Sequence, residues 1–131
     1  MQIIPNERFN GIACSKVALY YAYKDIYNQK IAVNDIIQTR PDGYLALAKM
    51  NHYINMFFHV KSAKQYSKQE RFSLAEFLLK GNDKKCIICV LGHYIYVDGV
   101  NYFSFFNNLH DKVVKVWYLE GKEWHIKSMV Y

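Results

Sequence analysis

Glycine, proline and long apolar runs are scarce in this sequence. The 131 residues include six glycines and two prolines, which excludes a collagen-like chain or a flexible linker. No uninterrupted apolar run is long enough to cross a bilayer. The first residues, Met1 to Arg8, lack the basic and then apolar order of a secretory signal. These absences predict a soluble domain, cytoplasmic or virion-associated, with no signal peptide and no transmembrane segment.

Cysteine is also scarce, and the patterns that hold metals or cofactors are missing. The three cysteines are an odd number, which argues against a disulfide framework. Cys86 and Cys89 form a C-x-x-C pattern inside an apolar run, where residues three apart point to opposite faces of a strand. We therefore interpret them as buried thiols rather than as a redox or zinc pair. No glycine-rich phosphate loop is present, so the sequence predicts no metal and no cofactor.

The composition provides enough apolar material for one core. Hydrophobic residues make up 52% of the chain and charged residues 21%, as in a single globular domain. The 17 basic and 11 acidic residues give a net charge of +6, a weak preference for acidic partners. The lysines form no dense run, so there is no clear nucleic-acid or membrane signal. The 12 Tyr and 8 Phe indicate an aromatic-rich core, or base-stacking platforms if they line a basic groove.

The hydrophobic pattern changes once, near Gly81, from helical to strand-like. It predicts one α+β domain with a helical part at about 9–81 and a sheet part at about 85–131. The expected helices run from about Cys14 to Tyr27, from Asn34 to Thr39, from Tyr44 to Phe57, and from a capping box at Ser73 to Gly81. The first of these is apolar almost all round, which is typical of a buried helix.

The expected strands include a hairpin. They are Phe58–Lys64, Cys86–Leu91, His93–Val97, Val100–Phe106, Lys112–Leu119 and Glu123–Val130. Asp98-Gly99 between two β-rich runs indicates a two-residue turn, which would pair His93 with Ser104. Paired residues share a face of the sheet, and that face continues at every second residue. Asn108 would then lie on the His93 side and Asn107 would point away, and one bulge would exchange the two.

Cys14 and His93 are the residues whose positions suggest chemistry. A helix N-terminus stabilises a thiolate, and a neighbouring imidazole held by a third polar group completes the activation of a nucleophile. We take Asn108 as the first candidate for that orienting group, followed by Asn107 and Asp111. The alternative is that Cys14 is a small buried hydrophobe, which is the usual role of a lone cysteine at an apolar helix start.

The same residues carry a resemblance to a known family. A cysteine at a helix start, then Gly92-His93-Tyr94-Ile95-Tyr96-Val97-Asp98-Gly99-Val100 and Tyr102–Asn108, resemble papain-like cysteine peptidases, most closely the bacteriocin-processing C39 group. The resemblance covers roughly Phe9 to Leu119. It implies a papain-like fold in which an N-terminal helical lobe carrying Cys14 packs on a C-terminal antiparallel sheet carrying His93. The family usually has Asp-Cys-Gly, whereas this chain has Ala13-Cys14-Ser15.

The resemblance also implies an activity. Cys14 would attack a carbonyl carbon of a peptide or protein substrate and form an acyl-thioester, and His93 would transfer the protons. The family places an oxyanion-hole glutamine about six residues before the cysteine. Arg8 occupies that place here, which leaves Asn10 and Asn6 as the oxyanion candidates. The reaction is then peptide hydrolysis, glutamine deamidation or another acyl transfer.

Two other functional classes remain open at this stage. The fold can persist without activity as a peptide-binding or structural module, for example a phage accessory component, and the altered cysteine context favours this alternative. A basic nucleic-acid binder is a third and weaker hypothesis. Neither the composition nor the motifs indicate an oligomeric state.

Overall fold

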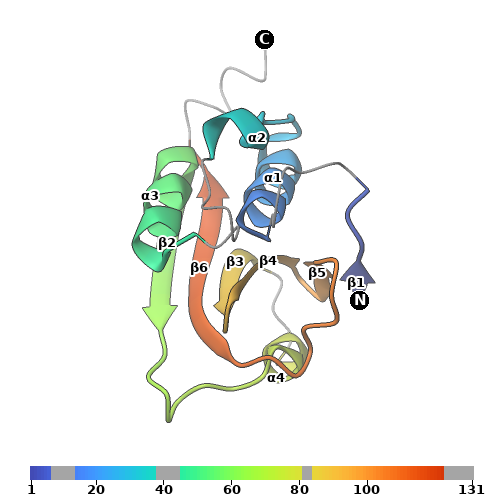
Figure 1. Cartoon of the computed structure of the whole chain (residues 1–131), viewed down its shortest axis with the longest axis vertical. Helices are drawn as coiled ribbons and strands as arrows, with labels where there is room; N and C mark the ends of the chain where they lie inside the picture. The colour runs from blue at the N-terminus through green and yellow to red at the C-terminus, as the bar shows by residue number, and fades with distance from the viewer. Residues whose placement is uncertain (7–13, 38–44, 81–83, 123–131) are drawn as a thin grey trace.

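The computed structural model describes residues 1–6, 14–37, 45–80 and 84–122, and within them four helices and a six-stranded sheet (Figure 1). The helices are α1 (Cys14–Tyr27), α2 (Val33–Ile36), α3 (Leu47–Phe57) and α4 (Leu74–Leu79). The strands are β1 (Gln2–Ile3), β2 (Phe58–Gln65), β3 (Lys85–Val90), β4 (His93–Asp98), β5 (Asn101–Phe103) and β6 (Val113–Gly121). The α+β class predicted from the sequence is confirmed. Across the described ranges, no helix is long and apolar enough to span a bilayer.

The sheet does not separate cleanly from the helical part of the chain. Its strand order is β1-β5-β4-β3-β6-β2, so two strands from the first half form its edges. β1 runs parallel to β5, whereas the other neighbours are antiparallel. The strand expected at Phe58–Lys64 is β2, and it forms one edge of the sheet beside β6. The parallel strand β1 at the other edge was not expected, because two residues are too few for a pattern.

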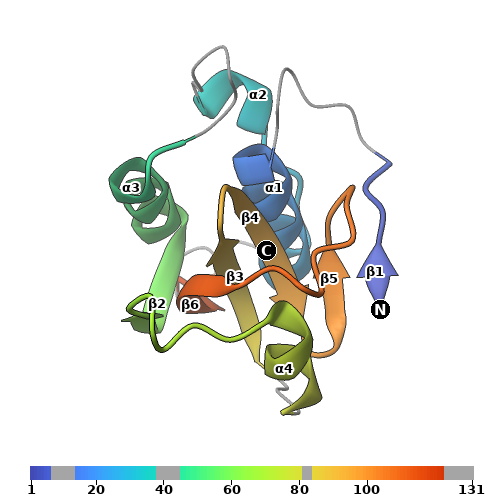
Figure 2. The same ribbon diagram turned by 60° about the horizontal axis from the view of Figure 1, so that its bottom comes forward.

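Helices cover both faces of the sheet, as Figure 2 shows. On one face α1 and α3 pack against a cluster that includes Tyr94, Tyr96 and Trp117. On the other face α4 packs against a second cluster that includes Ile95 and Val97. The alternation along β4 thus sends successive side chains into different cores, as the pleat of a strand requires.

The two cysteines of the C-x-x-C pattern follow the same alternation. Cys86 belongs to the α4 cluster and Cys89 to the α1 cluster. Both are buried free thiols, as the strand interpretation predicts.

α1 is buried because its apolar residues surround the helix. Every residue from Cys14 to Ala22 is buried, which confirms the expectation from the sequence. α4 begins as the capping box predicts, since the Ser73 hydroxyl accepts the backbone N–H of Glu76 at 3.2 Å. α4 ends at Leu79.

Other predicted boundaries shift or fall outside the described residues. α2 ends at Ile36, because Ile37 is extended, rather than at Thr39. α3 begins at Leu47 instead of Tyr44. The last expected strand, Glu123–Val130, lies outside the described residues, as does the start of the α3 prediction at Tyr44.

The β4–β5 hairpin turns one residue later than predicted. Asp98 pairs with Asn101, and Gly99-Val100 forms the turn with Gly99 at φ +63°. Glycine accepts that left-handed conformation without strain, while Asp98 stays in the strand and contacts Lys85. Val97 therefore pairs with Tyr102 and not with Val100, so the predicted pairing of His93 with Ser104 is wrong. The pairing of β5 with β4 is shifted by two residues from the prediction. Because two is an even number, each side chain stays on the sheet face that was predicted for it.

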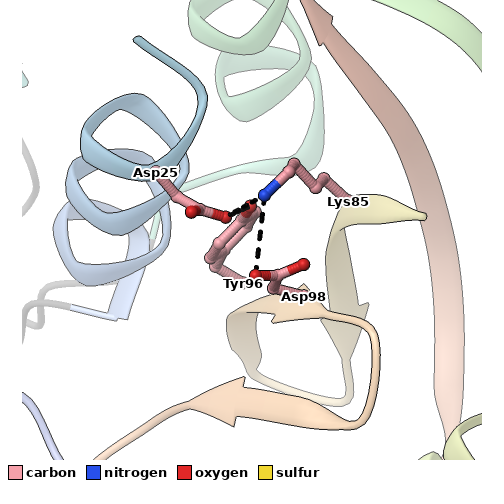
Figure 3. A network of polar contacts seen from close by, with 4 residues as sticks. All are labelled: Asp25, Lys85, Tyr96 and Asp98. Carbon is pink, nitrogen blue, oxygen red and sulfur yellow. Dashed lines mark hydrogen bonds and ion pairs between the residues drawn. The ribbon is translucent and has the colours of Figure 1, made fainter. Parts of the chain in front are cut away.

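A polar network fixes the C-terminal half of α1 to the sheet (Figure 3). Lys85 Nζ lies 2.6 Å from Asp25 Oδ2 and 3.5 Å from Asp98 Oδ2. The Tyr96 hydroxyl donates to the same Asp25 oxygen at 2.5 Å. Burial raises the pKa of Asp25, but Lys85 and Tyr96 together outweigh it and hold that pKa below its ordinary value. The carboxylate thus links α1 to both β3 and β4.

We expect Asn51→Ala to destabilise the fold through the core indole of Trp117. Trp117 is fully buried, and its Nε1 donates to Asn51 Oδ1 at 2.9 Å. Loss of this acceptor leaves a buried N–H unpaired, which costs about 1–3 kcal/mol. Urea unfolding of Asn51→Ala, Trp117→Phe and the double variant measures the coupling. An equal cost of Asn51→Ala with either residue at position 117 would contradict this account.

Candidate functional site

Cys14 is the first residue of α1, and its sulfur faces backbone N–H groups. Its side chain is buried, with 7% of the residue exposed. Burial raises the pKa of the thiol, while hydrogen bonds from the backbone N–H groups of Tyr94, Ser15 and Cys14 itself offset part of that effect. The net result is a pKa above that of an ordinary thiol. The helix N-terminus therefore supplies the amides that a thiolate needs, but the surroundings keep the resting thiol protonated.

A second thiol lies in the same core as Cys14. Cys89 pairs with Tyr94 across the β3–β4 ladder, and both belong to the α1 cluster. Burial and the nearby Cys14 raise the pKa of Cys89 to about 12. Burial raises the pKa of Cys86 still further. Cys14 is therefore the thiol that we expect to react first in the folded protein.

His93 is the first residue of β4 and is half-buried at the end of the sheet. It follows the tight Leu91-Gly92 turn, in which Gly92 has φ +73°. Its ring meets the ring of Phe106 edge-on, with centroids 5.5 Å apart. Burial lowers the pKa of His93, and a hydrogen bond with the backbone of Gly92 and the charge of Asp111 oppose that shift in part. A neutral imidazole is the form of a general base.

The three predicted orienting residues have different surroundings. Asn108 is buried; its Oδ1 accepts the Ser104 hydroxyl at 2.6 Å and its Nδ2 donates to Asp111 Oδ2 at 2.6 Å. Asp111 is the group whose charge acts on His93. Asn107 is exposed, and its Oδ1 accepts a backbone N–H from the next turn. Asn108 therefore binds the carboxylate whose charge acts on His93, and the choice of Asn108 or Asp111 as the orienting group stays a prediction.

Cys14 and His93 share one end of β4 but not a side-chain contact. The amide that reaches the sulfur belongs to Tyr94, which directly follows His93. Strand alternation sends the Tyr94 side chain toward α1 and the His93 side chain toward the α4 face. Within the described part of the chain, no hydrogen bond joins the Cys14 thiol to the imidazole. A reacting pair therefore needs the imidazole to turn across the end of the strand.

Of the two oxyanion candidates, the structure describes Asn6 but not Asn10. Asn6 is exposed after β1, and Asn10 lies outside the described residues. Ser15, next to Cys14, is fully buried, and its hydroxyl has no partner among the residues that the structure describes. Among those same residues, no group of three or more metal-binding side chains is clustered.

Two groups at the candidate site, a side chain and a backbone amide, were not identified from the sequence. Ser104 holds both Asn108 and the backbone N–H of Phe106, the latter at 3.2 Å. The backbone amide of Tyr94 reaches the sulfur, and a backbone group has no sequence signal. For Ser104 a signal existed, because a buried serine on the His93 face of a hairpin needs a polar partner.

The chain matches no protein-family model, no curated protein and no solved structure. Any assignment of function therefore depends on the geometry described above.

We expect the half-buried imidazole of His93 to make the fold less stable in mild acid. Its pKa lies below 6.5, the ordinary value, so below about pH 6.5 the unfolded chain binds more protons and the free energy of unfolding falls. His93→Gln should reduce the loss of stability between about pH 7 and pH 5. Urea unfolding at both pH values tests this, with the exposed His52 changed to Gln as the matched control. The same pH dependence in His93→Gln as in the native protein would contradict the role of His93 in the loss of stability.

Proposed function

We propose that this protein is a cysteine-dependent amide hydrolase in which Cys14 is the nucleophile and His93 the general base. The observation that carries the proposal is the hydrogen bond from the Tyr94 amide to the Cys14 sulfur. It holds the sulfur against the backbone that begins with His93. This support is independent of the sequence resemblance to papain-like peptidases, because it comes from the packing of α1 on β4.

The proposed reaction is acyl transfer through a thioester. The imidazole takes the thiol proton, and the thiolate attacks the carbonyl carbon of an amide. The tetrahedral intermediate collapses when the imidazolium gives its proton to the leaving amine. Water, deprotonated by the same imidazole, then hydrolyses the thioester and restores the thiol. Once the sulfur has bonded to the carbonyl carbon, the N–H groups of Cys14 and Ser15 that contact the resting sulfur are suited to stabilise the oxyanion beside it.

Asp111 and Asn108 support this chemistry indirectly. The Asp111 carboxylate stabilises the imidazolium that forms during proton transfer, and it raises the pKa of His93 against the effect of burial. Asn108 fixes that carboxylate by donating to Oδ2, and Ser104 fixes Asn108 in turn. This Ser104–Asn108–Asp111 chain is buried at Ser104 and Asn108, where hydrogen bonds have the largest effect on geometry.

A second candidate is an inactive domain of the same kind that binds a peptide or has a structural role. The raised pKa of Cys14 favours it, because a protonated, buried thiol is a poor nucleophile. The two candidates differ in one property that can be measured. In the hydrolase, His93 controls the reactivity of Cys14, whereas in the inactive domain the thiol titrates alone.

We expect the alkylation of Cys14 by iodoacetamide to depend on His93. In the hydrolase, His93→Ala should slow the reaction at pH 7 by about tenfold or more, because the base that removes the thiol proton is lost. Peptide mapping by mass spectrometry separates Cys14 from Cys86 and Cys89. His52→Ala is the matched control and should leave the rate unchanged.

The pH profile of the same reaction distinguishes the two candidates. A rate that rises with the ionisation of one high-pKa thiol, and is equal in the native protein and in His93→Ala, would refute the hydrolase and support the inactive domain. Asp111→Asn should move the profile in the same direction as His93→Ala, but by less.

A further inference from the structure

Lysines that are scattered in the sequence gather on one surface of the folded protein. We call it the lysine face, and it comprises Lys61, Lys64, Lys80, Lys84, Lys85, Tyr66, Phe72, Phe77 and Tyr118. Lys64 lies on exposed β2 opposite Val116, a residue of the α4 cluster. Lys64 and Tyr118, which packs against the α4 cluster, therefore lie on the α4 side of the sheet, whereas Lys85 at the edge of the face reaches Asp25 of α1.

Two adjoining pockets make up this surface. The first has a volume of about 500 Å³ and is lined by Lys64, Tyr66, Glu70, Phe72, Phe77, Lys80 and Tyr118. The second has a volume of about 640 Å³ and is lined by Lys61, Ser62, Lys84, Lys85, Tyr118 and Leu119. Tyr118 lines both pockets, so they adjoin at its side chain beside β2 and β6.

The lysines and aromatic rings of the lysine face are paired. Three ammonium groups lie over rings that line the pockets: Lys64 over Tyr66 at 5.2 Å, Lys80 over Phe72 at 5.0 Å, and Lys84 over Tyr118 at 5.1 Å. Each pair sets a positive charge beside the flat face of a π-system. Cation–π contacts of this kind are weak at an exposed site, so a ligand can displace the ammonium groups.

The positive charge of the lysine face is only partly compensated. Lys61 lies 3.9 Å from Glu120, and Lys85 pairs with Asp25. Glu70 is the acidic residue that lines the first pocket, and Ser67 holds its carboxylate through both N–H and hydroxyl. Within the described residues, no carboxylate lies within ion-pair distance of Lys64 or Lys80, although the charge of Lys64 contributes, after the hydrogen bonds from Ser67, to the lowered pKa of Glu70.

We propose that the lysine face binds single-stranded nucleic acid. Interleaved lysines and aromatic rings in an open groove are what a flexible polyanion with flat bases requires. A base stacks on a ring in place of the ammonium, and the released lysine moves to the adjacent phosphate. A duplex hides the faces of its bases, and an acidic peptide has no planar groups in regular succession. The rings therefore favour a single strand over either of them.

Fluorescence anisotropy of a fluorescein-labelled 20-nucleotide oligo(dT), titrated with the full chain at several salt concentrations, tests the proposal. Lys64→Gln/Lys80→Gln/Lys84→Gln should weaken binding by about tenfold or more and reduce the slope of log affinity against log salt by about 2. The charge-matched control is Lys24→Gln/Lys30→Gln/Lys49→Gln, three exposed lysines outside the lysine face. It should weaken binding by less than about threefold, since long-range attraction alone is lost.

Tyr118→Leu separates stacking from simple charge attraction. It keeps an apolar side chain but removes the ring, so the affinity for oligo(dT) should fall. The affinity for a duplex of the same length should be weaker than that for oligo(dT) in the native protein and should not change in Tyr118→Leu. Circular dichroism confirms the fold of each variant, and Cys14→Ala should bind like the native protein.

Three results would overturn the proposal. The first is that oligo(dT) does not bind at low salt, and the second is that both triple variants lose the same affinity for it. The third is that a duplex or phosphatidylserine vesicles bind as tightly as the single strand and that Tyr118→Leu does not change the affinity for oligo(dT). Each of these outcomes leaves the hydrolase hypothesis untouched, because none of the residues changed in the triple variants or in Tyr118→Leu belongs to the Cys14–His93 site.

Discussion

The packing of α1 on β4 is the interaction on which the rest of the structure depends. Two alternate residues of β4 hold the helix. The backbone of Tyr94 donates to the sulfur of Cys14 at the helix start, and the hydroxyl of Tyr96 donates to Asp25 near the helix end. Because Tyr94 contacts the start of the helix and Tyr96 contacts a residue near its end, helix and strand run in the same direction. The candidate nucleophile is thereby placed at the end of the sheet where β4 begins.

Burial and hydrogen bonding act in opposite directions at this end of the sheet. Burial raises the pKa of Cys14 and lowers that of His93, so each group is neutral at rest. Three amides beside the sulfur and the Asp111 carboxylate near the imidazole favour the charged forms. A substrate that draws the imidazole toward the sulfur would let each charge stabilise the other, as in a thiolate–imidazolium pair. The buried Ser104–Asn108–Asp111 chain keeps the carboxylate in place for that step.

Local features of the fold could be predicted from the sequence, whereas features that depend on distant pairing could not. The apolar surround of α1 and the Ser73 cap are properties of a few adjacent residues, and both predictions were confirmed. The hairpin turn was misplaced because Asp98 is held in the strand by Lys85, a partner on β3. β1 joins the sheet through its pairing with β5. No local pattern in two residues reveals such a contact.

At the candidate site too, local features could be predicted from the sequence and contacts between distant residues could not. Cys14 and His93 were chosen from local patterns, and the structure brings their backbones to one end of β4. The roles of Asn108 and Asp111 depend on hydrogen bonds within the loop after β5. The periodicity of a strand does not predict those hydrogen bonds. The lysine face was also hidden, because it assembles residues from β2, the end of α4 and the start of β3.

Cross-linking tests most directly whether the thiol and the imidazole can meet. In 1,3-dibromoacetone the two reactive carbons are separated by one carbonyl, so the reagent can bridge a sulfur and a ring nitrogen that approach each other closely. After treatment of the native protein and proteolysis, the account predicts a bridged peptide pair that joins Cys14 to His93, and its loss in His93→Gln with Cys14 still alkylated. A bridge from Cys14 to Cys89, or a single adduct on Cys14 in the native protein, would contradict the central claim that these two groups act together.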